Sequence, residues 1–370
     1  MSPSEPPPQP LPHIGPMVDD RVQRERFGAH ELAMVISHYG LGVIEQIRVC
    51  PRGSRRAPKL RIKAGRGEFL LKRRALGRDD PYRVAFAHSL QLFLVEHGYP
   101  VPELIGTRQG NNSMLQLNGR IYEMFQYTTG TRYDGSAEAT EQAGRALGAL
   151  HRLLARYQPP YEAPVATFHA APAIDAQLAR IPDAAAAIEP QADRSAFRDT
   201  CASLRKAYRE AAKRVDQTGF RSQRKVIIHG DWHPGNLLYR RGAVVAVLDF
   251  DSARLEPRIA DIANAALQFS IKMPAHDDPA DWPEGLDVER IRRLVRGFDH
   301  DAEHPVRSDE LVALPWLMIE ALILESVVPI AATGSFGRIA GSTFLPMIER
   351  KIHWIAPRAG KIIRFLQEQR

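Results

Sequence analysis

The sequence of 370 residues predicts an α+β protein with two unequal lobes: a small five-stranded antiparallel sheet with one inserted helix, then a larger, mostly helical lobe. Three observations support this prediction. Short apolar runs lie between Gly, Pro and Ser residues over residues 28–127, which is typical of strands. From Ala137 onward, apolar residues recur at helical spacing instead. The chain is also too long for one small core and shows no internal repeat.

The elements of the first lobe follow in order. A short helix precedes three strands joined by hairpin loops. A second helix starts at Pro81 and stops at His97–Gly98, and Pro100 and Pro102 lead into the last two strands. The predicted helices are His30–Tyr39 and Pro81–Glu96, and the predicted strands are Gly42–Val49, Lys59–Ala64, Glu68–Arg73, Leu104–Thr107 with Ser113–Leu117, and Arg120–Tyr127.

The second lobe begins with an amphipathic helix that ends near Tyr157. Residues 158–190 are rich in Pro and Ala and are predicted as loop with short helical pieces. The later predicted elements are a charged helix at Asp193–Val215, β runs at Val226–His229, Leu237–Tyr239 and Val244–Phe250, and helices beyond Ile259 interrupted by a polar loop at Pro274–Gly285. The expected organisation is a Pro-rich tail at 1–27, the first lobe at 28–122, a hinge at 123–128 and the helical lobe at 129–370.

The charge of the chain narrows the class of partner. A formal net charge of +7 is compatible with nucleic acid, an anionic membrane or a phosphorylated small molecule. Residues 48–83 hold thirteen Lys and Arg against three acidic residues, so this segment carries +10 and the remaining residues carry −3. The excess belongs to one lobe, and it favours a polyphosphate nucleotide. A nucleic-acid partner is not expected, because the Arg-rich loop shows neither interleaved aromatic residues nor a recognisable nucleic-acid-binding module.

Cysteine usage and the most apolar segments indicate the compartment. Cys50 and Cys201 lie in no metal-ligand cluster, which predicts a reducing, cytoplasmic location and no structural zinc. The first sixteen residues contain seven prolines and no apolar region of the signal-peptide kind. The most hydrophobic stretch, Val312–Ile330, includes Glu320 and Glu325, so we expect a buried helix and no membrane contact.

The segment Ile227–Ala253 contains the residues best suited to chemistry. Asp231 is followed five residues later by Asn236 and thirteen residues after that by Asp249, and apolar strands flank all three. Phosphoryl transfer needs such a set, since one carboxylate orients the nucleophile while an amide and a second carboxylate hold Mg²⁺ against the phosphates. The same spacing, with the second Asp before a Phe, is a kinase signature.

With these motifs the chain resembles the aminoglycoside phosphotransferase and choline kinase-like superfamily. The resemblance covers most of residues 40–270. It implies a bilobal protein-kinase-like fold, ATP and Mg²⁺ as cofactors, and a small hydroxylated acceptor bound by the helical lobe. The matching motifs are His229–Gly230–Asp231 with Asn236, Leu248–Ala253, Asp261–Ile262–Ala263 and Leu147–Leu153.

The resemblance implies roles for individual residues of the helical lobe. Asp231 would orient and deprotonate the acceptor, and Asn236 and Asp249 would bind Mg²⁺. Asp261 would brace the catalytic loop from the following helix, and His229 would support that loop by hydrogen bonds. His233, beside Trp232, is interpreted as a local packing feature.

The resemblance also implies nucleotide contacts in the first lobe. Lys72 would hold the phosphates, and strand alternation places it with Leu70 on the face over the cleft. The backbone of the hinge would read the adenine edge at the residues Glu123, Met124 and Phe125.

Two features depart from the pattern of the superfamily. The usual partner of the lysine is a glutamate on the following helix, but His88 stands at the matching place, so the ion pair is either absent or replaced by a His–Lys arrangement. The loop Cys50–Lys59 has a single glycine, and it is either a phosphate contact through Arg52, Arg55 and Arg56 or a solvated basic loop.

Three functions are compatible with these residues. A small-molecule kinase is the leading hypothesis. A Ser/Thr protein kinase of the bacterial stress-response type is the first alternative, although only nine residues separate Asp251 from Asp261, too few for a peptide platform. A nucleotide-binding pseudokinase is the second alternative, favoured by the missing helix glutamate. No motif identifies the acceptor or the oligomeric state.

Overall fold

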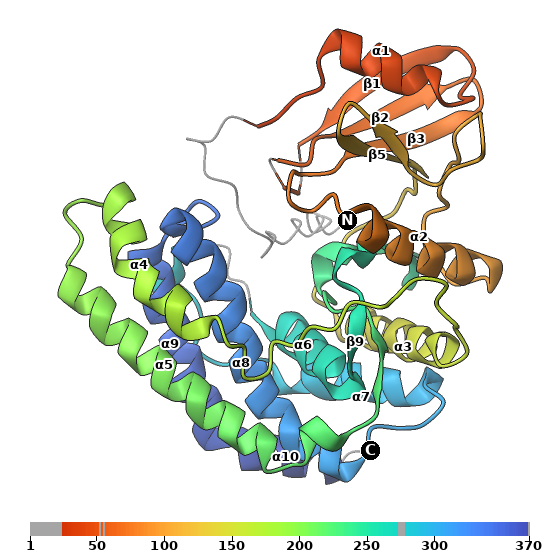
Figure 1. The fold of residues 1–370 in the computed structure, drawn as a ribbon. Helices are drawn as coiled ribbons and strands as arrows, with labels where there is room; N and C mark the ends of the chain where they lie inside the picture. Colours follow the sequence, from red (N-terminus) through yellow and green to blue (C-terminus); the bar gives the residue numbers. More distant parts are fainter. Residues whose placement is uncertain (1–23, 52, 55, 273–277, 369–370) are drawn as a thin grey trace, which may run out of the picture.

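The structure, a computed structural model, describes residues 24–51, 53–54, 56–272 and 278–368. Two lobes are visible, a sheet-rich lobe above and a larger helical lobe below (Figure 1). The upper lobe contains one five-stranded antiparallel sheet. This arrangement confirms the α+β bilobal fold that the sequence predicts. Most of the Pro-rich tail, residues 1–23, lies outside the described residues.

The sheet has the order β1-β2-β3-β5-β4, which places β3 in its centre. Its strands match the sequence prediction closely, except that Leu104–Thr107 forms no strand and makes only an isolated bridge from Leu104 to Phe125. Pro102 precedes this segment and Gly106 lies within it, so it runs irregularly beside β5. The elements are α1 (Ala29–Ser37), β1 (Ile44–Cys50), β2 (Lys59–Ala64), β3 (Gly67–Arg73), α2 (Pro81–Glu96), β4 (Leu115–Leu117) and β5 (Arg120–Gln126).

The helical lobe contains the loop between β6 and β7, residues 229–236, which we call the catalytic loop. Two short antiparallel pairs, β6 with β9 and β7 with β8, hold that loop. Its elements are α3 (Ala137–Leu154), α4 (Ile174–Ile188), α5 (Arg194–Asp216), η1 (Phe220–Ser222), β6 (Lys225–Ile228), η2 (Pro234–Asn236), β7 (Leu237–Arg240), β8 (Ala243–Val247), η3 (Phe250–Ser252), β9 (Arg254–Pro257), α6 (Arg258–Ser270), η4 (Pro279–Asp281), α7 (Val288–Asp301), α8 (Ser308–Thr333), β10 (Ser335–Phe336), β11 (Ile339–Ala340), α9 (Gly341–Ile355), η5 (Ala356–Arg358) and α10 (Ala359–Glu368).

Helix α4 corrects the prediction of loop over residues 158–190. Its richness in Pro and Ala favoured a loop, and Pro182 does lie inside the helix. However, Ile174, Leu178, Ile181 and Ala185 recur at helical spacing and are all buried. Helix α4 packs against α8, so burial of this apolar face outweighs the weak local preference.

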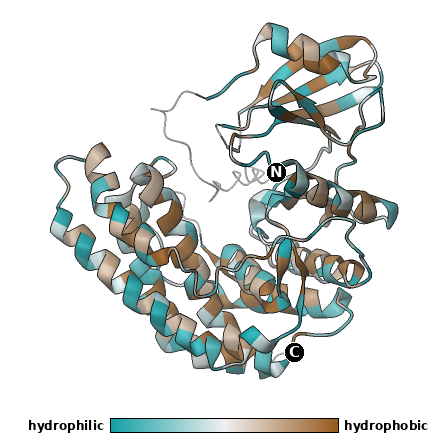
Figure 2. Ribbon diagram, viewed as in Figure 1, coloured by the Kyte–Doolittle hydropathy of each residue, from teal (hydrophilic) through white to brown (hydrophobic). Residues whose placement is uncertain are grey.

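The apolar side chains form two separate cores. The smaller core joins the sheet to α1, whereas Phe86, Leu90 and Leu94 of α2 belong to the core of the helical lobe. Figure 1 shows α2 beside α3, below the sheet. Apolar residues are concentrated on the strands and the helices that form these cores (Figure 2). Helix α2 is therefore continuous in sequence with the sheet but packed with the other lobe.

Among the described residues, α8 is the one helix that is long and apolar enough to span a membrane by length and composition. Most of its apolar window is buried inside the protein. The structure therefore places the stretch Val312–Ile330 in a core helix, as the sequence predicts.

Helices α3 and α7 approach each other closely through glycines. A Cβ atom on Gly297 would lie 2.1 Å from the carbonyl oxygen of Glu141, and one on Gly144 would lie 2.1 Å from the carbonyl oxygen of Leu294. Both atoms that would clash belong to the backbone, which cannot move aside as a flexible side chain can. The two glycines thus set the distance between α3 and α7.

We expect Gly297→Ala to lower the free energy of unfolding by about 3 kcal/mol, because overpacking outweighs the gain in helix propensity of about 1 kcal/mol. Gly360→Ala in α10 is the matched control, since the nearest atom to its new Cβ would be a side-chain nitrogen 3.9 Å away. Urea denaturation of both variants measures the difference. Equal or greater stability of Gly297→Ala would contradict the close helix contact.

Candidate active site

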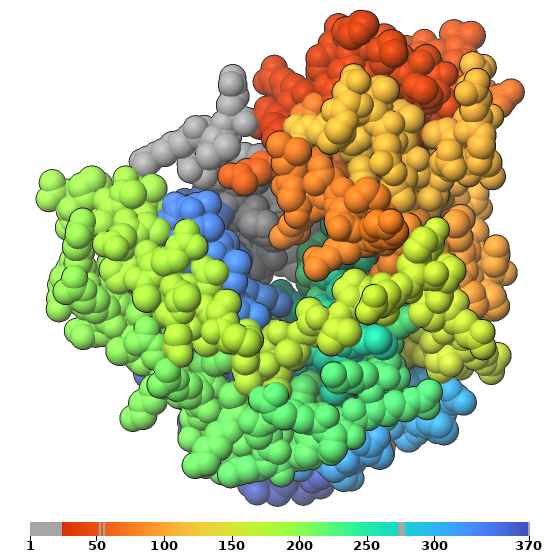
Figure 3. Space-filling model, viewed as in Figure 1, coloured from red at the N-terminus to blue at the C-terminus, as the bar shows by residue number. Residues whose placement is uncertain are grey.

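A cavity of about 1440 Å³ is lined by residues of both lobes. Figure 3 shows the hollow between the sheet-rich lobe and the helical lobe. The lining includes Lys72 from β3 and, from the helical lobe, Asp231, Asn236 and Asp249. The structure thus brings together four of the residues that the sequence singles out.

The catalytic loop leaves β6 through a tight turn. Gly230 has a φ of +76°, and a Cβ there would lie 2.4 Å from the carbonyl oxygen of Ser252. Asp261, in the first turn of α6, accepts hydrogen bonds from the amides of His229 (2.8 Å) and Gly230 (2.9 Å). These are the contacts that the bracing role of Asp261 requires. His151 of α3 adds a third contact, with its Nε2 lying 3.0 Å from Asp261 Oδ2.

His229 is fully buried and supports the loop. Its Nδ1 accepts a hydrogen bond from the amide of Asp231, so Nε2 carries the proton and donates to the carbonyl oxygen of Leu248 at 3.1 Å. Burial lowers the pKa of His229, although Asp261 opposes the shift. The ring is therefore neutral and links the catalytic loop to the segment that leads to Asp249.

Asp231 presents its carboxylate to the cavity, with 41% of the side chain exposed. The amide nitrogen of Asn236 donates to the Asp231 carbonyl oxygen (3.0 Å) and to its Oδ2 (3.1 Å). Burial alone would raise the pKa of Asp231, but His233, His229 and Asn236 hold it below its ordinary value. The carboxylate is therefore ionised at neutral pH.

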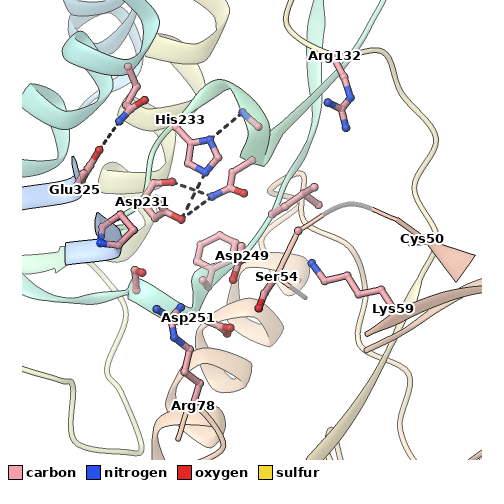
Figure 4. A pocket seen from close by; sticks show the side chains of 18 of the residues that line it. Cys50, Ser54, Lys59, Arg78, Arg132, Asp231, His233, Asp249, Asp251 and Glu325 are labelled. Atoms are coloured by element: carbon pink, nitrogen blue, oxygen red, sulfur yellow. Dashed lines mark hydrogen bonds and ion pairs between the residues drawn. The ribbon is translucent and has the colours of Figure 1, made fainter. Parts of the chain in front are cut away.

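His233 corrects the interpretation as a packing residue. It lines the cavity, and its Nε2 lies 3.6 Å from Asp231 Oδ2. The amide of Gly235 donates to His233 Nδ1 at 3.0 Å, which leaves the Nε2 proton directed at Asp231. Figure 4 shows the ring between these two groups. The His-Pro-Gly turn that aims the ring is visible in the sequence, but the direction of the ring is not.

The Asp-Phe-Asp segment bends into the cavity. Asp249 adopts the left-handed conformation (φ +63°), and Phe250 is buried behind it. Asp249 and Asp251 both line the cavity, opposite Lys59 of β2 (Figure 4). The strained backbone at Asp249 turns two carboxylates toward the same space.

Lys72 lies on the cleft face of β3 together with Leu70, as strand alternation predicts. Its Nζ lies 3.0 Å from Asp251 Oδ2 and 3.4 Å from Glu123 Oε2. Burial alone would lower the pKa of Lys72, but these carboxylates raise it above its ordinary value. Lys72 is therefore held as a cation by two carboxylates.

Arg74 completes a four-membered ion-pair cluster, which we call the inter-lobe cluster: Lys72, Arg74, Glu123 and Asp251. Arg74 Nη2 lies 2.7 Å from Glu123 Oε1 and 2.5 Å from Asp251 Oδ1. Burial alone would raise the pKa of Asp251, yet Lys72 and Arg74 hold it at about 2. Two cations and two anions thus join β3 and β5 to the Asp-Phe-Asp segment.

The structure corrects both expectations about the partner of Lys72. The ion pair is not absent, and His88 does not contact the lysine itself. Glu123 of β5 is directly opposite Lys72 in the sheet and supplies the carboxylate that α2 lacks at position 88. His88 Nε2 lies 2.7 Å from Glu123 Oε1, so the histidine orients the glutamate. Burial alone would raise the pKa of Glu123, but Lys72, His88 and Arg74 hold it well below its ordinary value.

The hinge expected at residues 123–128 begins before the last strand of the sheet has ended. Strand β5 continues to Gln126, so Glu123, Met124 and Phe125 all lie within the sheet. Met124 is completely buried and does not line the cavity, whereas Phe125 does. The carbonyl oxygen of Met124 already accepts a hydrogen bond from the amide of Ile105. The pairing of β3 with β5 thus extends through these three residues, as far as Gln126.

The loop after β1 contributes small groups and one lysine. Gly53, Ser54 and Lys59 line the cavity. Lys59 is the cross-strand neighbour of Lys72, and burial, followed by the charge of Lys72, lowers the pKa of Lys59. Arg56 is exposed. The remaining two arginines expected to contact phosphates, Arg52 and Arg55, lie outside the described residues.

Glu325 of α8 is a cavity residue that sequence reasoning assigned no role. It faces Asp231 and His233 across the cavity (Figure 4), and Gln268 Nε2 donates to its Oε2 at 2.5 Å. Burial and the charge of Asp231 raise the pKa of Glu325 to about 7. The available signal was a glutamate inside the apolar pattern of α8, one of two in that pattern together with Glu320.

The donor atoms for a cation come from more than one segment. In the described part of the chain, no group of three or more His, Cys, Asp or Glu side chains is arranged to hold a metal by itself. Asn236 directs its amide nitrogen at Asp231, so its oxygen is the atom that could bind a metal. With Asp249, this donor set suits Mg²⁺, which binds one or two carboxylates and completes its shell with water and phosphate oxygens.

Comparison with known proteins identifies the family of the chain. The family model described as the phosphotransferase enzyme family matches residues 47–307. The chain therefore belongs to this phosphotransferase family, and it is an enzyme of the kinase class with an alcohol group as acceptor. No curated protein matches the chain.

Solved structures share the fold at low identity. An amicoumacin kinase in complex with AMP-PNP, Ca²⁺ and Ami is 13% identical with a TM-score of 0.66, covering 89% of this chain and 94% of the other. An aminoglycoside phosphotransferase from Alicyclobacillus acidocaldarius is 15% identical with a TM-score of 0.62, covering 95% and 98%. A microcompartment-associated aminopropanol kinase is 16% identical with a TM-score of 0.62, covering 92% and 98%.

We expect Glu123→Gln to lower the free energy of unfolding at pH 7 by about 3 kcal/mol, because it leaves two buried cations with one carboxylate. Glu96→Gln, on the exposed face of α2, removes the same charge and should change stability by less than about 0.5 kcal/mol. Chemical denaturation measures both values. Equal effects of the two variants would show that the inter-lobe cluster does not form.

Glu325 should make stability depend on pH. Its pKa of about 7 lies above that of an unfolded glutamate, so the folded state binds the proton more tightly and loses stability as pH rises from about 4.5 to about 7. Glu325→Gln removes this loss. The Tm of the variant relative to the unaltered protein should therefore increase between pH 5 and pH 8, whereas Glu303→Gln at an exposed turn should show no such trend.

Proposed function

We propose that the protein transfers the γ-phosphate of ATP to a hydroxyl of a small molecule, with Mg²⁺ as the metal. One observation carries this proposal. Asp231, Asn236 and Asp249 line the cavity on the wall that the helical lobe forms, and Lys59 and Lys72 line it on the wall that the sheet forms. A phosphate chain between these walls would meet cations on one side and metal-binding oxygens on the other, which is the charge arrangement that phosphoryl transfer needs.

Asp231 is the proposed catalytic base. Its lowered pKa keeps it ionised, and its exposed carboxylate can accept the proton of an acceptor hydroxyl. Asn236 and His233 fix the carboxylate from the protein side. The neutral His229 holds the same loop to the carbonyl of Leu248 and takes no part in proton transfer.

Asn236 and Asp249 are the proposed ligands of Mg²⁺. When bound, the metal would neutralise charge on the phosphates of the nucleotide. The amicoumacin kinase structure, which contains AMP-PNP and Ca²⁺, supports a nucleotide and a divalent cation in this fold. Lys72 would contact the phosphates from β3, while Glu123 and Asp251 hold its position.

The backbone from Phe125 onward is the proposed binding site for the adenine ring of ATP. Met124 is excluded from this role by its burial and by the hydrogen bond of its carbonyl to Ile105. Leu70, Phe125 and Thr128 line this end of the cavity and offer the apolar walls that a purine ring needs.

The two alternative functions lose their support. The pseudokinase hypothesis rested on the missing helix glutamate and on a phosphate loop with a single glycine, and Glu123 supplies the carboxylate partner of Lys72 that the first ground lacked. A protein-kinase activity needs a platform between Asp251 and Asp261, and this segment is occupied by η3, β9 and the first turn of α6. A small acceptor within the cavity therefore fits better than a peptide on the surface.

The decisive measurement is ADP release with ATP, Mg²⁺ and a panel of hydroxylated acceptors. We expect Asp231→Asn to lower kcat by about 10³, the usual contribution of a general base. Asp183→Asn, in which the side chain is 87% exposed on α4, should keep the activity. A protein acceptor being phosphorylated while every small molecule fails would contradict the proposal.

Metal binding is tested separately by thermal protection. AMP-PNP with Mg²⁺ should raise the Tm of the protein, because a ligand that binds only the folded state stabilises it. Asp249→Ala should lose the part of the shift that depends on Mg²⁺, and Asp183→Asn should retain it. An unchanged shift in Asp249→Ala would overturn the assignment of Asp249 as a ligand.

A further inference from the structure

The cavity continues beyond Asp231 into a chamber of the helical lobe. Its walls come from the C-terminal half of α8, the β10–β11 hairpin and α9. We call this part the acceptor chamber and define it by Trp282, Glu325, Val328, Phe336 and Phe344, with Lys351 and Arg338 at its far side.

The wall of the acceptor chamber is largely apolar and aromatic. Phe336 stacks on Phe344 with ring centroids 4.1 Å apart and an angle of 11°, and Trp282 meets Phe344 edge-on at 6.3 Å. Val328 leaves 43% of its surface exposed. Stacked rings have little freedom to rearrange, so this surface is preorganised for an apolar group.

Among the residues that the structure describes, few charged groups line the chamber, and they lie at its two ends. Glu325 lies at the end near Asp231. At the other end, Lys351 donates from Nζ to the carbonyl oxygen of Pro283 at 2.5 Å, and Arg338 also lines the wall. Besides Asp231 itself, a molecule with several ammonium groups would find Glu325 near the reacting hydroxyl and two basic side chains farther in.

We propose that the acceptor is an amphipathic alcohol. Its reacting hydroxyl lies at Asp231, one neighbouring N–H or O–H donor binds Glu325, and its apolar body packs against Val328 and Phe336. Compact polyols and polycationic amino sugars are poor acceptors. This inference rests on the proposed function only in placing the reacting hydroxyl at Asp231.

The test uses three amino alcohols that differ only in the apolar group: alaninol, leucinol and phenylalaninol. Calorimetry measures their affinity for the protein saturated with AMP-PNP and Mg²⁺, and ADP release with ATP measures turnover. Burial of a methylene group is worth about 0.8 kcal/mol, a factor of about four in affinity. We therefore expect at least about a tenfold gain from alaninol to leucinol, and weaker binding of kanamycin than of leucinol.

Two valines of α8 provide a matched pair of variants. Val328→Asp should lower the affinity for phenylalaninol about tenfold and change the affinity for alaninol by less than about twofold, because only the larger molecule reaches the apolar wall. Val312 is similarly exposed, at 40%, but lies outside the cavity, so Val312→Asp should change neither affinity. If Val328→Asp does not fold, Phe336→Ser in the hairpin tests the same wall.

The outcomes separate the two proposals. Affinity that does not rise with apolar size, tighter binding of kanamycin, or equal effects of the two valine variants would overturn the amphipathic acceptor. Size-dependent binding that Val328→Asp abolishes, without any ADP release, would support the acceptor chamber and overturn the proposed function.

Discussion

The inter-lobe cluster is the interaction on which the arrangement of the site depends. Two cations, Lys72 and Arg74, are balanced there by two carboxylates, Glu123 of β5 and Asp251 of the Asp-Phe-Asp segment. Arg74 and Glu123 are buried, Lys72 is mostly buried, and Asp251 lies at the exposed edge of the cluster. A buried charge destabilises the folded protein unless an opposite charge lies beside it. Removing one member of the cluster would therefore leave an unpaired buried charge and lower the stability of the fold. Because the apolar cores of the two lobes are separate, this polar contact fixes the lysine of the sheet relative to the catalytic loop.

The sequence was sufficient for the fold and for the catalytic loop, because both depend on short-range patterns. Strand and helix periods gave the two lobes, and the spacing from Asp231 to Asp249 identified the loop. The role of Glu123 was not predictable in the same way, since it follows from the cross-strand register that sets it opposite Lys72. Lys59 became a neighbour of Lys72 by the same register. Helix α4 was missed for a different reason, because tertiary burial outweighed its composition.

The positive charges concentrated in residues 48–83 do more than attract a nucleotide. Arg73 is largely buried and pairs with Glu25 and Glu31 across the other face of the sheet. Arg61 pairs with Glu68, and Arg74 belongs to the inter-lobe cluster. Part of the excess thus serves the internal structure of the sheet lobe, and Lys59 and Lys72 are the basic residues of the sheet that face the cavity.

The packing of α2 with the helical lobe divides the chain into units that need not unfold together. The sheet with α1 has a core of its own, whereas Phe86, Leu90 and Leu94 tie α2 to the larger one. The amide hydrogens of the sheet can therefore exchange through an opening that leaves α2 and the helical lobe intact. A molecule that bridges β3 and the catalytic loop would slow this exchange by adding its binding energy to the cost of opening. The stability of the sheet would then report occupancy of the cleft.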